Sequence, residues 1–163
     1  MVILLKVLLV ENTSWQSKDL AQALFLSPTE ISFSLKRCQY ARLLDGQSRN
    51  VSRRTFFEFL FYGLPVTFPT QPGEQVRGMP TAHSAAPLSQ QVVAGQLYVW
   101  PDAESDSWGC AIEPLYPRVL QAAKADARLY ELLALADALR VGRPRERKLA
   151  GDLLKAFIMP ANV

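Results

Sequence analysis

The sequence predicts an α+β protein with helices at both ends and a proline-rich middle. Apolar residues recur at helical spacing near both ends, whereas the middle is broken by prolines and contains a strand-like run. Hydrophobic residues make up 49% of the 163 residues, which excludes wholesale disorder. We therefore expect an N-terminal domain over residues 1–62, an irregular segment with short strands over 63–118, and helices over 119–163.

The chain begins with an apolar run, MVILLKVLLV, which we interpret as a buried helix over residues 2–10. The run is about half as long as a bilayer span requires. It continues into Glu11 without a small-residue cleavage site, so we expect neither a membrane segment nor a leader. Cys38 and Cys110 show no paired spacing. Reduced thiols and a cytoplasmic location are therefore expected.

A second helix is expected over residues 18–24, with Ser17 as its cap and Leu20, Ala21 and Leu24 on its apolar face. Phe25 follows in a turn position that prefers glycine. A different residue is tolerated there when the backbone avoids a positive φ.

The third helix begins at a strong start signal, Ser27-Pro28-Thr29-Glu30. Ser27 is the cap, Glu30 completes a capping box, and Pro28 stands where its missing N–H costs nothing. We expect this helix to bury Ile31, Leu35 and Cys38 and to end near Arg42.

The two helices fit the spacing of a helix-turn-helix, whose second helix enters the major groove of DNA. This geometry needs a small residue in the first helix and a hydrophobic residue about ten positions later. Ala21 and Ile31 meet both needs. The polar turn at residues 45–50, followed by Val51, predicts two short strands that form a wing. The N-terminal domain is thus expected to be a winged helix-turn-helix.

The segment LAQALFLSPTEISFSLKR, followed by ARLL, resembles the winged-helix core of the MarR-type bacterial regulators. The resemblance covers residues 1 to about 55 and implies a transcription regulator that binds double-stranded DNA. The C-terminal two thirds do not resemble the dimerisation helices of that family. On the third helix the resemblance implies DNA contacts from Ser27, Pro28, Thr29, Ser32, Phe33 and Lys36. In the wing it implies contacts from Arg49, Asn50, Arg53 and Arg54.

The charge distribution agrees with that expectation. Residues 1–62 carry eight Lys and Arg against five Asp and Glu, whereas the other 101 residues carry ten of each. Between Lys36 and Arg54 there are six basic residues and one acidic residue, Asp45. The positive excess therefore lies where a phosphate-facing surface would need it.

Secondary structure in the middle is less regular. Residues 55–62 (TFFEFLFY) fit either a buried helix or a strand, and we expect Gly63 and Pro65 to end the run. Residues 66–68 look extended. Prolines then interrupt residues 69–91, which we interpret as a long loop or a clamp.

After this segment, residues 96–100 are typical of a strand that ends at Pro101, and residues 102–107 form an acidic turn. Helical spacing returns at Val119. The apolar stripe of this helix consists of Leu129, Leu132, Leu133, Ala136 and Leu139. We expect part of the stripe to be uncovered and to support a homodimer. After a break at Gly142 and Pro144, a last helix is expected from about Arg145 to Phe157.

The sequence offers little for catalysis, so we expect no enzyme, no cofactor and no metal site. The single histidine, His83, precedes Ser84, but neighbours in sequence rarely point together, and a loop histidine bonded to the backbone is the expected alternative. Asp102, Glu104 and Asp106 have the alternate spacing of a calcium loop, yet Ser107 stands where that loop needs glycine. We interpret them as a solvated turn.

Two questions remain open. The first is the role of the basic cluster at residues 140–148, for which three roles fit: contact with flanking phosphates, binding of an acidic partner, or a charged turn between helices. The whole protein would alternatively be a winged-helix adaptor, antitoxin-like, that binds a partner protein through its C-terminal two thirds. The proline-rich residues 69–91 suggest the adaptor, because extended chains often order on a partner.

Overall fold

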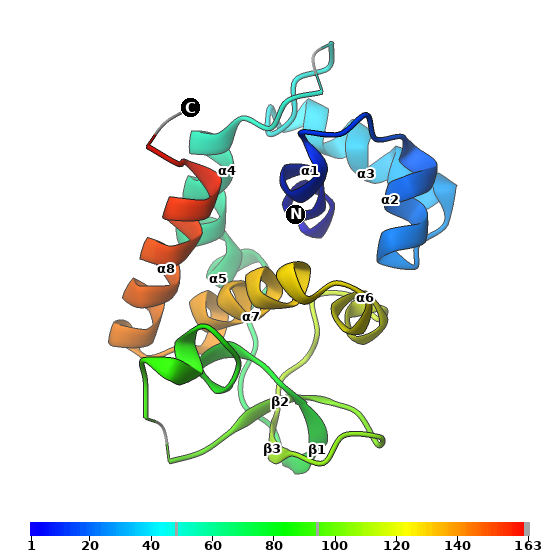
Figure 1. Ribbon diagram of the computed structural model, residues 1–163. Coiled ribbons are helices and arrows are strands. Elements are labelled where there is room, and N and C mark those ends of the chain that lie inside the picture. The colour runs from blue at the N-terminus through cyan, green and yellow to red at the C-terminus, as the bar shows by residue number, and fades with distance from the viewer. Residues whose placement is uncertain (48, 94, 162–163) are drawn as a thin grey trace.

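A computed structural model describes residues 1–47, 49–93 and 95–161 of the chain. It confirms the mixed α+β class: helices surround a central helix, and a small sheet lies at one side (Figure 1). In chain order the helices are α1 (Val2–Val10), α2 (Ser17–Leu24), α3 (Pro28–Tyr40), α4 (Arg53–Glu58), α5 (Leu64–Thr67), α6 (Val119–Ala125), α7 (Ala127–Val141) and α8 (Pro144–Ile158). The strands are β1 (Gln75–Pro80), β2 (Tyr98–Pro101) and β3 (Trp108–Ala111).

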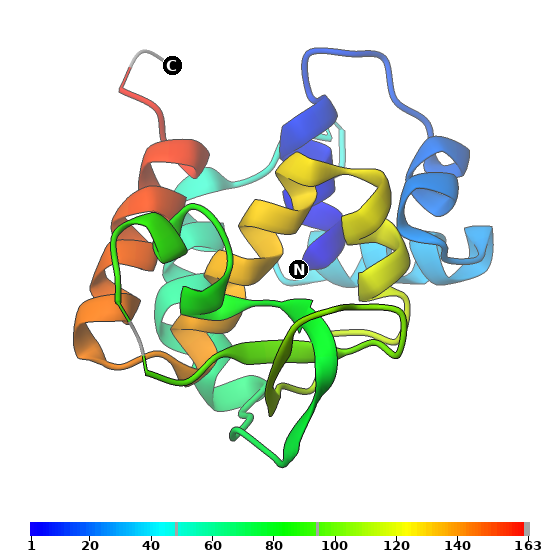
Figure 2. The same cartoon turned by 60° about the horizontal axis from the view of Figure 1, so that its bottom comes forward.

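Helix α7 is the centre of the core. It contacts α1, α5, α6 and α8, and it runs between the N-terminal helices and the sheet (Figures 1 and 2). The predicted apolar stripe is therefore covered by the chain itself, and all five of its residues are at most 2% exposed: Leu129, Leu132, Leu133, Ala136 and Leu139. The expectation that this stripe is partly uncovered was wrong, because its neighbours come from segments far away in the sequence.

The sheet is small and closes on itself. Strand β1 pairs antiparallel with β2 through residues 78–80 and with β3 through residues 75–77, while β2 and β3 pair in parallel. Close packing leaves no room for a side chain at two glycines. A Cβ at Gly78 would lie 2.2 Å from the carbonyl oxygen of Trp100, and one at Gly109 would lie 2.5 Å from that of Leu97.

The aromatic run after residue 52 is helical, not extended. Helix α4 continues through a π-helical turn, Phe59–Gly63, into α5. The expectation that Gly63 and Pro65 end the run was wrong, because helical structure continues to Thr67. The expectation that residues 66–68 are extended was also wrong for Val66 and Thr67, and only Phe68 lies outside the helix. Pro65 lies in the first turn of α5, where its missing N–H costs little, and the N–H of Leu64 donates to the carbonyl of Phe59.

Residues 69–91 are also more regular than expected. They contain β1 and two short 3-10 turns, Ala82–Ser84 and Leu88–Gln90, and the first turn packs on α7. At the end of β1, the hydroxyl of Tyr130 on α7 donates to the carbonyl of Pro80 at 2.6 Å. The interpretation as a loop or a clamp was therefore wrong for β1 and the two short turns, whereas residues 69–74 are irregular as expected. The strands and the helix on which this stretch packs come from other parts of the chain.

Helix starts and ends follow local chemistry closely. Ser27 accepts from the Glu30 N–H at 3.2 Å and Glu30 accepts from the Ser27 N–H at 2.8 Å, which confirms the capping box. Helix α2 is instead capped by Gln16, with Ser17 as its first helical residue. Asp126 ends α6 and caps α7, so the expected single helix from Val119 is two. Within the described residues, every helix is too short or too polar to cross a bilayer.

Candidate nucleic-acid interface

Helices α2 and α3 are joined by a short turn and pack against each other (Figure 1). Ala21 and Ile31, the small and hydrophobic positions of the expected motif, are 5% and 0% exposed. Phe25, between the helices, has φ 54°, so the expectation that this backbone avoids a positive φ was wrong. The next N–H, of Leu26, donates to the Ala21 carbonyl at 3.0 Å and closes the helix end in a Schellman-type bond.

One face of α3 points to solvent and the other is buried. Ile31, Leu35 and Cys38 are at most 7% exposed and form the inner face. The six residues on and before α3 that the sequence places at a DNA contact are all exposed: Ser27, Pro28, Thr29, Ser32, Phe33 and Lys36. The helical register expected from the sequence is thereby the observed one. Hydroxyls, an aromatic ring and an ammonium group lie together on a face that the core does not use.

Two further residues of α3 belong to this surface and were not among the predicted contacts. Tyr40 is 94% exposed and lies one turn beyond Lys36. Arg37 is exposed as well, and its guanidinium donates to the Ser34 hydroxyl at 2.7 Å. The spacing of seven residues from Phe33 to Tyr40 was the signal that could have identified the tyrosine.

The segment expected to be a wing is a hairpin held by a single bridge. Leu44 pairs with Val51, and backbone bonds join the Asp45 N–H to the Asn50 carbonyl and the Ser52 N–H to the Leu43 carbonyl, each 2.9 Å long. The expectation of two strands was therefore wrong. Residues 45–50 are mostly polar, and Gly46 and Gln47 form a turn, so little remains to extend the ladder.

The predicted wing residues divide into two groups. Arg49 and Asn50 lie in the hairpin, where the Arg49 guanidinium is 4.1 Å from the centre of the Trp15 ring. Arg53 and Arg54 instead begin α4, so their assignment to the wing was wrong. Arg54 forms an exposed ion pair with Glu58 at 3.0 Å.

Arg53 is used within the fold. Its guanidinium donates to the Ile158 carbonyl at 2.5 Å and forms an ion pair with Glu11, which joins α4 to the end of α8 and to the end of α1. A guanidinium with these partners is poorly placed to contact a phosphate. We therefore remove Arg53 from the candidate interface and keep Arg49, Asn50 and Arg54.

The two groups of residues considered for catalysis and for metal binding, namely His83 with Ser84 and the acidic turn at residues 102–107, have structural roles. The Nε2 of His83 bonds to the Gln96 carbonyl at 2.8 Å, while Ser84 accepts from the Tyr98 N–H, so the histidine bonds the backbone as expected. In the acidic turn, Asp102 forms an ion pair with Lys124 at 2.8 Å, and this ammonium lowers the pKa of the Asp102 carboxyl. Nowhere in the described ranges do three His, Cys, Asp or Glu gather as metal ligands.

The second basic cluster is split between core and surface. Arg140 is buried, paired with Asp137 at 2.7 Å, and donates to the carbonyls of Phe68 and Glu113. Arg143 and Arg145 are exposed at the turn between α7 and α8. Arg140 therefore takes no part in any phosphate contact of this cluster.

Comparison with models of protein families, with curated protein sequences and with solved structures finds no match for this chain. The site must therefore be judged from its own geometry.

Proposed function

We propose that this protein is a cytoplasmic transcription regulator, not an enzyme, that binds double-stranded DNA with α3 in the major groove. The observation that carries the proposal is the two-sided character of α3. Its inner face is anchored by residues such as Ile31, while its outer face presents Ser32, Phe33 and Lys36 to solvent. Any surface helix has a polar outer face, but this one also exposes the Phe33 ring, 57% accessible, which a recognition helix can place against bases.

The chemistry of the outer face suits base edges and phosphates. Hydroxyls of Thr29 and Ser32 can bond phosphate oxygens or bases, the Phe33 ring can contact a thymine methyl, and Lys36 can pair with guanine or a phosphate.

Exposed cations on α3 and further along the chain support the same proposal. Arg37, Arg42, Arg49 and Arg54 are all exposed within the stretch from α3 to α4. Exposed guanidinium groups release counterions when they meet phosphates, so they would raise affinity for any duplex sequence.

We further propose that the protein acts as a homodimer, because one recognition helix reads too few base pairs for regulatory specificity. The dimer surface is not the buried stripe of α7, so another face must provide it. The adaptor alternative is less favoured, since parts of residues 69–91 already have partners in the same chain: β1 pairs with β2 and β3, and the turn Ala82–Ser84 packs on α7.

The proposal is tested by selecting a preferred duplex from a random library and measuring binding by fluorescence anisotropy over a range of salt. Ser32→Ala with Phe33→Ala should cost about 1–3 kcal/mol of binding free energy per lost base contact on the selected duplex, with random DNA nearly unaffected. Tyr62→Ala is the matched control, since Tyr62 is an aromatic residue 70% exposed on another element.

Two results would contradict the proposal. The parent protein would select no sequence and show no dependence of affinity on salt, or the double variant would bind both duplexes as the parent does. Thermal unfolding of the double variant checks that a loss of binding is not a loss of folding.

A further inference from the structure

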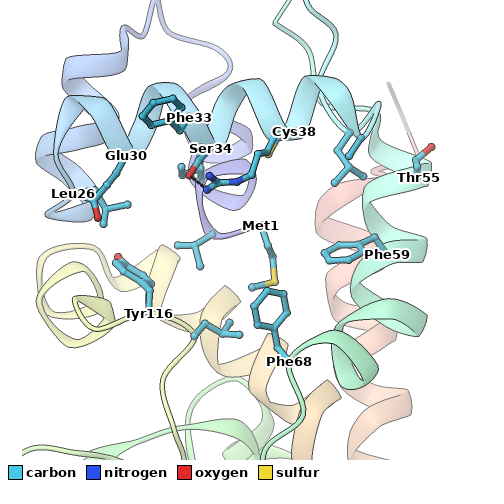
Figure 3. Close-up of a pocket in the computed structure, with 16 residues that line it drawn as sticks. Met1, Leu26, Glu30, Phe33, Ser34, Cys38, Thr55, Phe59, Phe68 and Tyr116 are labelled. Atoms are coloured by element: carbon cyan, nitrogen blue, oxygen red, sulfur yellow. Dashed lines mark hydrogen bonds between the residues drawn. The ribbon is translucent and has the colours of Figure 1, made fainter.

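One polar atom in the interior lacks a partner. Among the described residues, Nδ1 of His83 is the one buried side-chain nitrogen or oxygen without a hydrogen bond. It does not belong to the mainly apolar hollow of about 710 Å³ that separates the Arg37 flank of α3 from Phe68 and Tyr116 (Figure 3). An unpaired polar atom is costly in a protein interior, so the surroundings of this nitrogen need a physical account.

His83 lies in the turn Ala82–Ser84 and is 5% exposed. This turn packs on α7 and on β2, and the turn that follows it, Leu88–Gln90, packs on α8 (Figure 2). The imidazole meets the Tyr98 ring edge to face, with the ring centres 4.5 Å apart. His83 therefore lies where residues 82–92 join the helical core.

The other ring nitrogen fixes the position of one proton. Nε2 lies 2.8 Å from the carbonyl oxygen of Gln96. Because a carbonyl oxygen only accepts, Nε2 carries a proton. In the neutral ring Nδ1 then has a lone pair and no proton, and only the imidazolium carries a proton on both nitrogens.

Nδ1 faces a buried carboxylate. Oε2 of Glu146 lies 3.6 Å from Nδ1, and Glu146 is 6% exposed. The same oxygen accepts from the Arg143 N–H at 2.9 Å in the capping box of α8. A neutral ring would bury a lone pair against this carboxylate, whereas the imidazolium would donate to it and form an ion pair.

The elements packed on this turn bring other charged or titratable groups. Helix α7 brings Asp137, which is paired with Arg140 at 2.7 Å, β2 brings the Tyr98 phenol, and Leu88–Gln90 brings none. Two arginines flank Glu146 along α8: Arg145 and Arg147. Together with the positive end of the helix dipole, these arginines favour the carboxylate of Glu146 over its protonated form. The proton is therefore expected on the imidazole.

We propose that His83 and Glu146 form a pH-sensitive ion pair that holds residues 82–92 on the helical core. The pair forms when the imidazole is protonated and is lost when the ring gives up its proton. Because the folded state gains from the bound proton, residues 82–92 should be held most firmly in mild acid. Their hold should weaken as the pH rises through the range in which histidine titrates. Nothing in this pair depends on DNA binding.

The charge of the ring is tested by NMR. His83 is the single histidine of the sequence, so its ring signals are identified directly. Nitrogen-15 spectra from about pH 5 to about pH 9 distinguish the imidazolium from each neutral tautomer. We expect the imidazolium at the acid end and the neutral ring with its proton on Nε2 at the alkaline end. A ring that is neutral throughout, or a neutral ring with its proton on Nδ1, would overturn the proposal.

A pair of variants tests the role of the carboxylate. The amide N–H of Glu146→Gln can donate to the neutral Nδ1, so the midpoint of the ring titration should move toward acid by at least about one pH unit. Glu30→Gln is the matched control, since Glu30 has the same place in the capping box of α3. An equal midpoint in the parent and in Glu146→Gln would overturn the ion pair. Thermal unfolding shows whether both variants are folded, and the measurements on the parent stand without them.

The hold on residues 82–92 is measured by amide hydrogen exchange, corrected for the intrinsic exchange rate at each pH, with α7 as the internal reference. From about pH 6 to about pH 8, protection in the parent and in Glu30→Gln should fall at least about fivefold. In Glu146→Gln it should stay constant. Protection that does not change with pH in the parent, or that changes equally in Glu146→Gln, would overturn the proposal.

Discussion

The carboxylate of Asp137 on α7 accepts a hydrogen bond from the indole Nε1 of Trp100 on β2, over 2.6 Å. The same oxygen accepts from the Thr81 hydroxyl at 2.8 Å, and the other oxygen pairs with Arg140 at 2.7 Å. Asp137 has no exposed area and the Arg140 side chain is 4% exposed. This buried network joins the sheet to the central helix.

Asp137→Ala is expected to lower the free energy of unfolding by about 3–5 kcal/mol, because it leaves the buried Arg140 without its counter-charge. Thr81→Val is the matched control, since it removes one hydrogen bond and keeps the ion pair, at a cost of about 1–2 kcal/mol. Urea unfolding followed by circular dichroism measures both. Equal losses would mean that Arg140 finds another partner and that the ion pair is not what matters.

Phe25 is expected to carry backbone strain, because its φ of 54° lies in the left-handed region. The free energy of unfolding of Phe25→Gly should therefore be about 1 kcal/mol higher than that of Phe25→Ala. The alanine variant lacks the ring but keeps the Cβ. Comparing these two variants cancels the loss of the half-exposed ring. If thermal and urea unfolding find the two equally stable, the left-handed geometry costs nothing here.

Asp126 is expected to make stability depend on acid. Burial raises the pKa of the Asp126 carboxyl. The Lys6 ammonium and the N–H groups of Leu129 and Arg128 together lower this pKa by more than burial raises it, so it lies below its ordinary value. The stability that the Asp126 charge contributes is complete above about pH 3.9, the pKa of this carboxyl in the unfolded chain. It is lost as the pH falls through the lower pKa of the folded protein. Asp126→Ala should cost about 1–2 kcal/mol near neutral pH through the lost helix cap.

Asp126→Asn separates the charge from the cap, since its amide oxygen can still accept from α7. Unfolding followed from about pH 6 to about pH 2 should show the advantage of the parent over this variant shrinking in acid. An advantage that stays constant over this range would show that the Lys6 pair adds no stability.

Arg53 and Arg49 are expected to act through different properties. Arg53→Ala should lower the free energy of unfolding by about 1–3 kcal/mol, because it frees the Ile158 carbonyl and Glu11. Arg49→Ala should leave stability within about 1 kcal/mol, the scale of an exposed cation–π contact. It should weaken DNA binding at low salt and flatten the salt dependence by about one counterion. Loss of salt dependence in the Arg53 variant with unchanged stability would reverse these roles.

The sequence alone determined the features that depend on neighbours along the chain. The Ser27-Glu30 capping box, the buried face of α3 through Ile31 and Leu35, and the last helix after Pro144 were all predicted, because each arises from contacts within about one or two helical turns. The candidate interface was found for the same reason, since its outer face follows once the helix and its buried face are known.

Only the tertiary structure decided which surfaces remain open. The Leu129 stripe is covered by distant segments, Arg53 is taken up by the end of α8, and β1 forms because β2 and β3 pair with it on both sides. The hollow beside Arg37 likewise exists only where α3 faces Phe68 and Tyr116. Burial, ion pairing and cavities depend on residues brought together across the chain, and the spacing of residues within a segment carries no record of those partners.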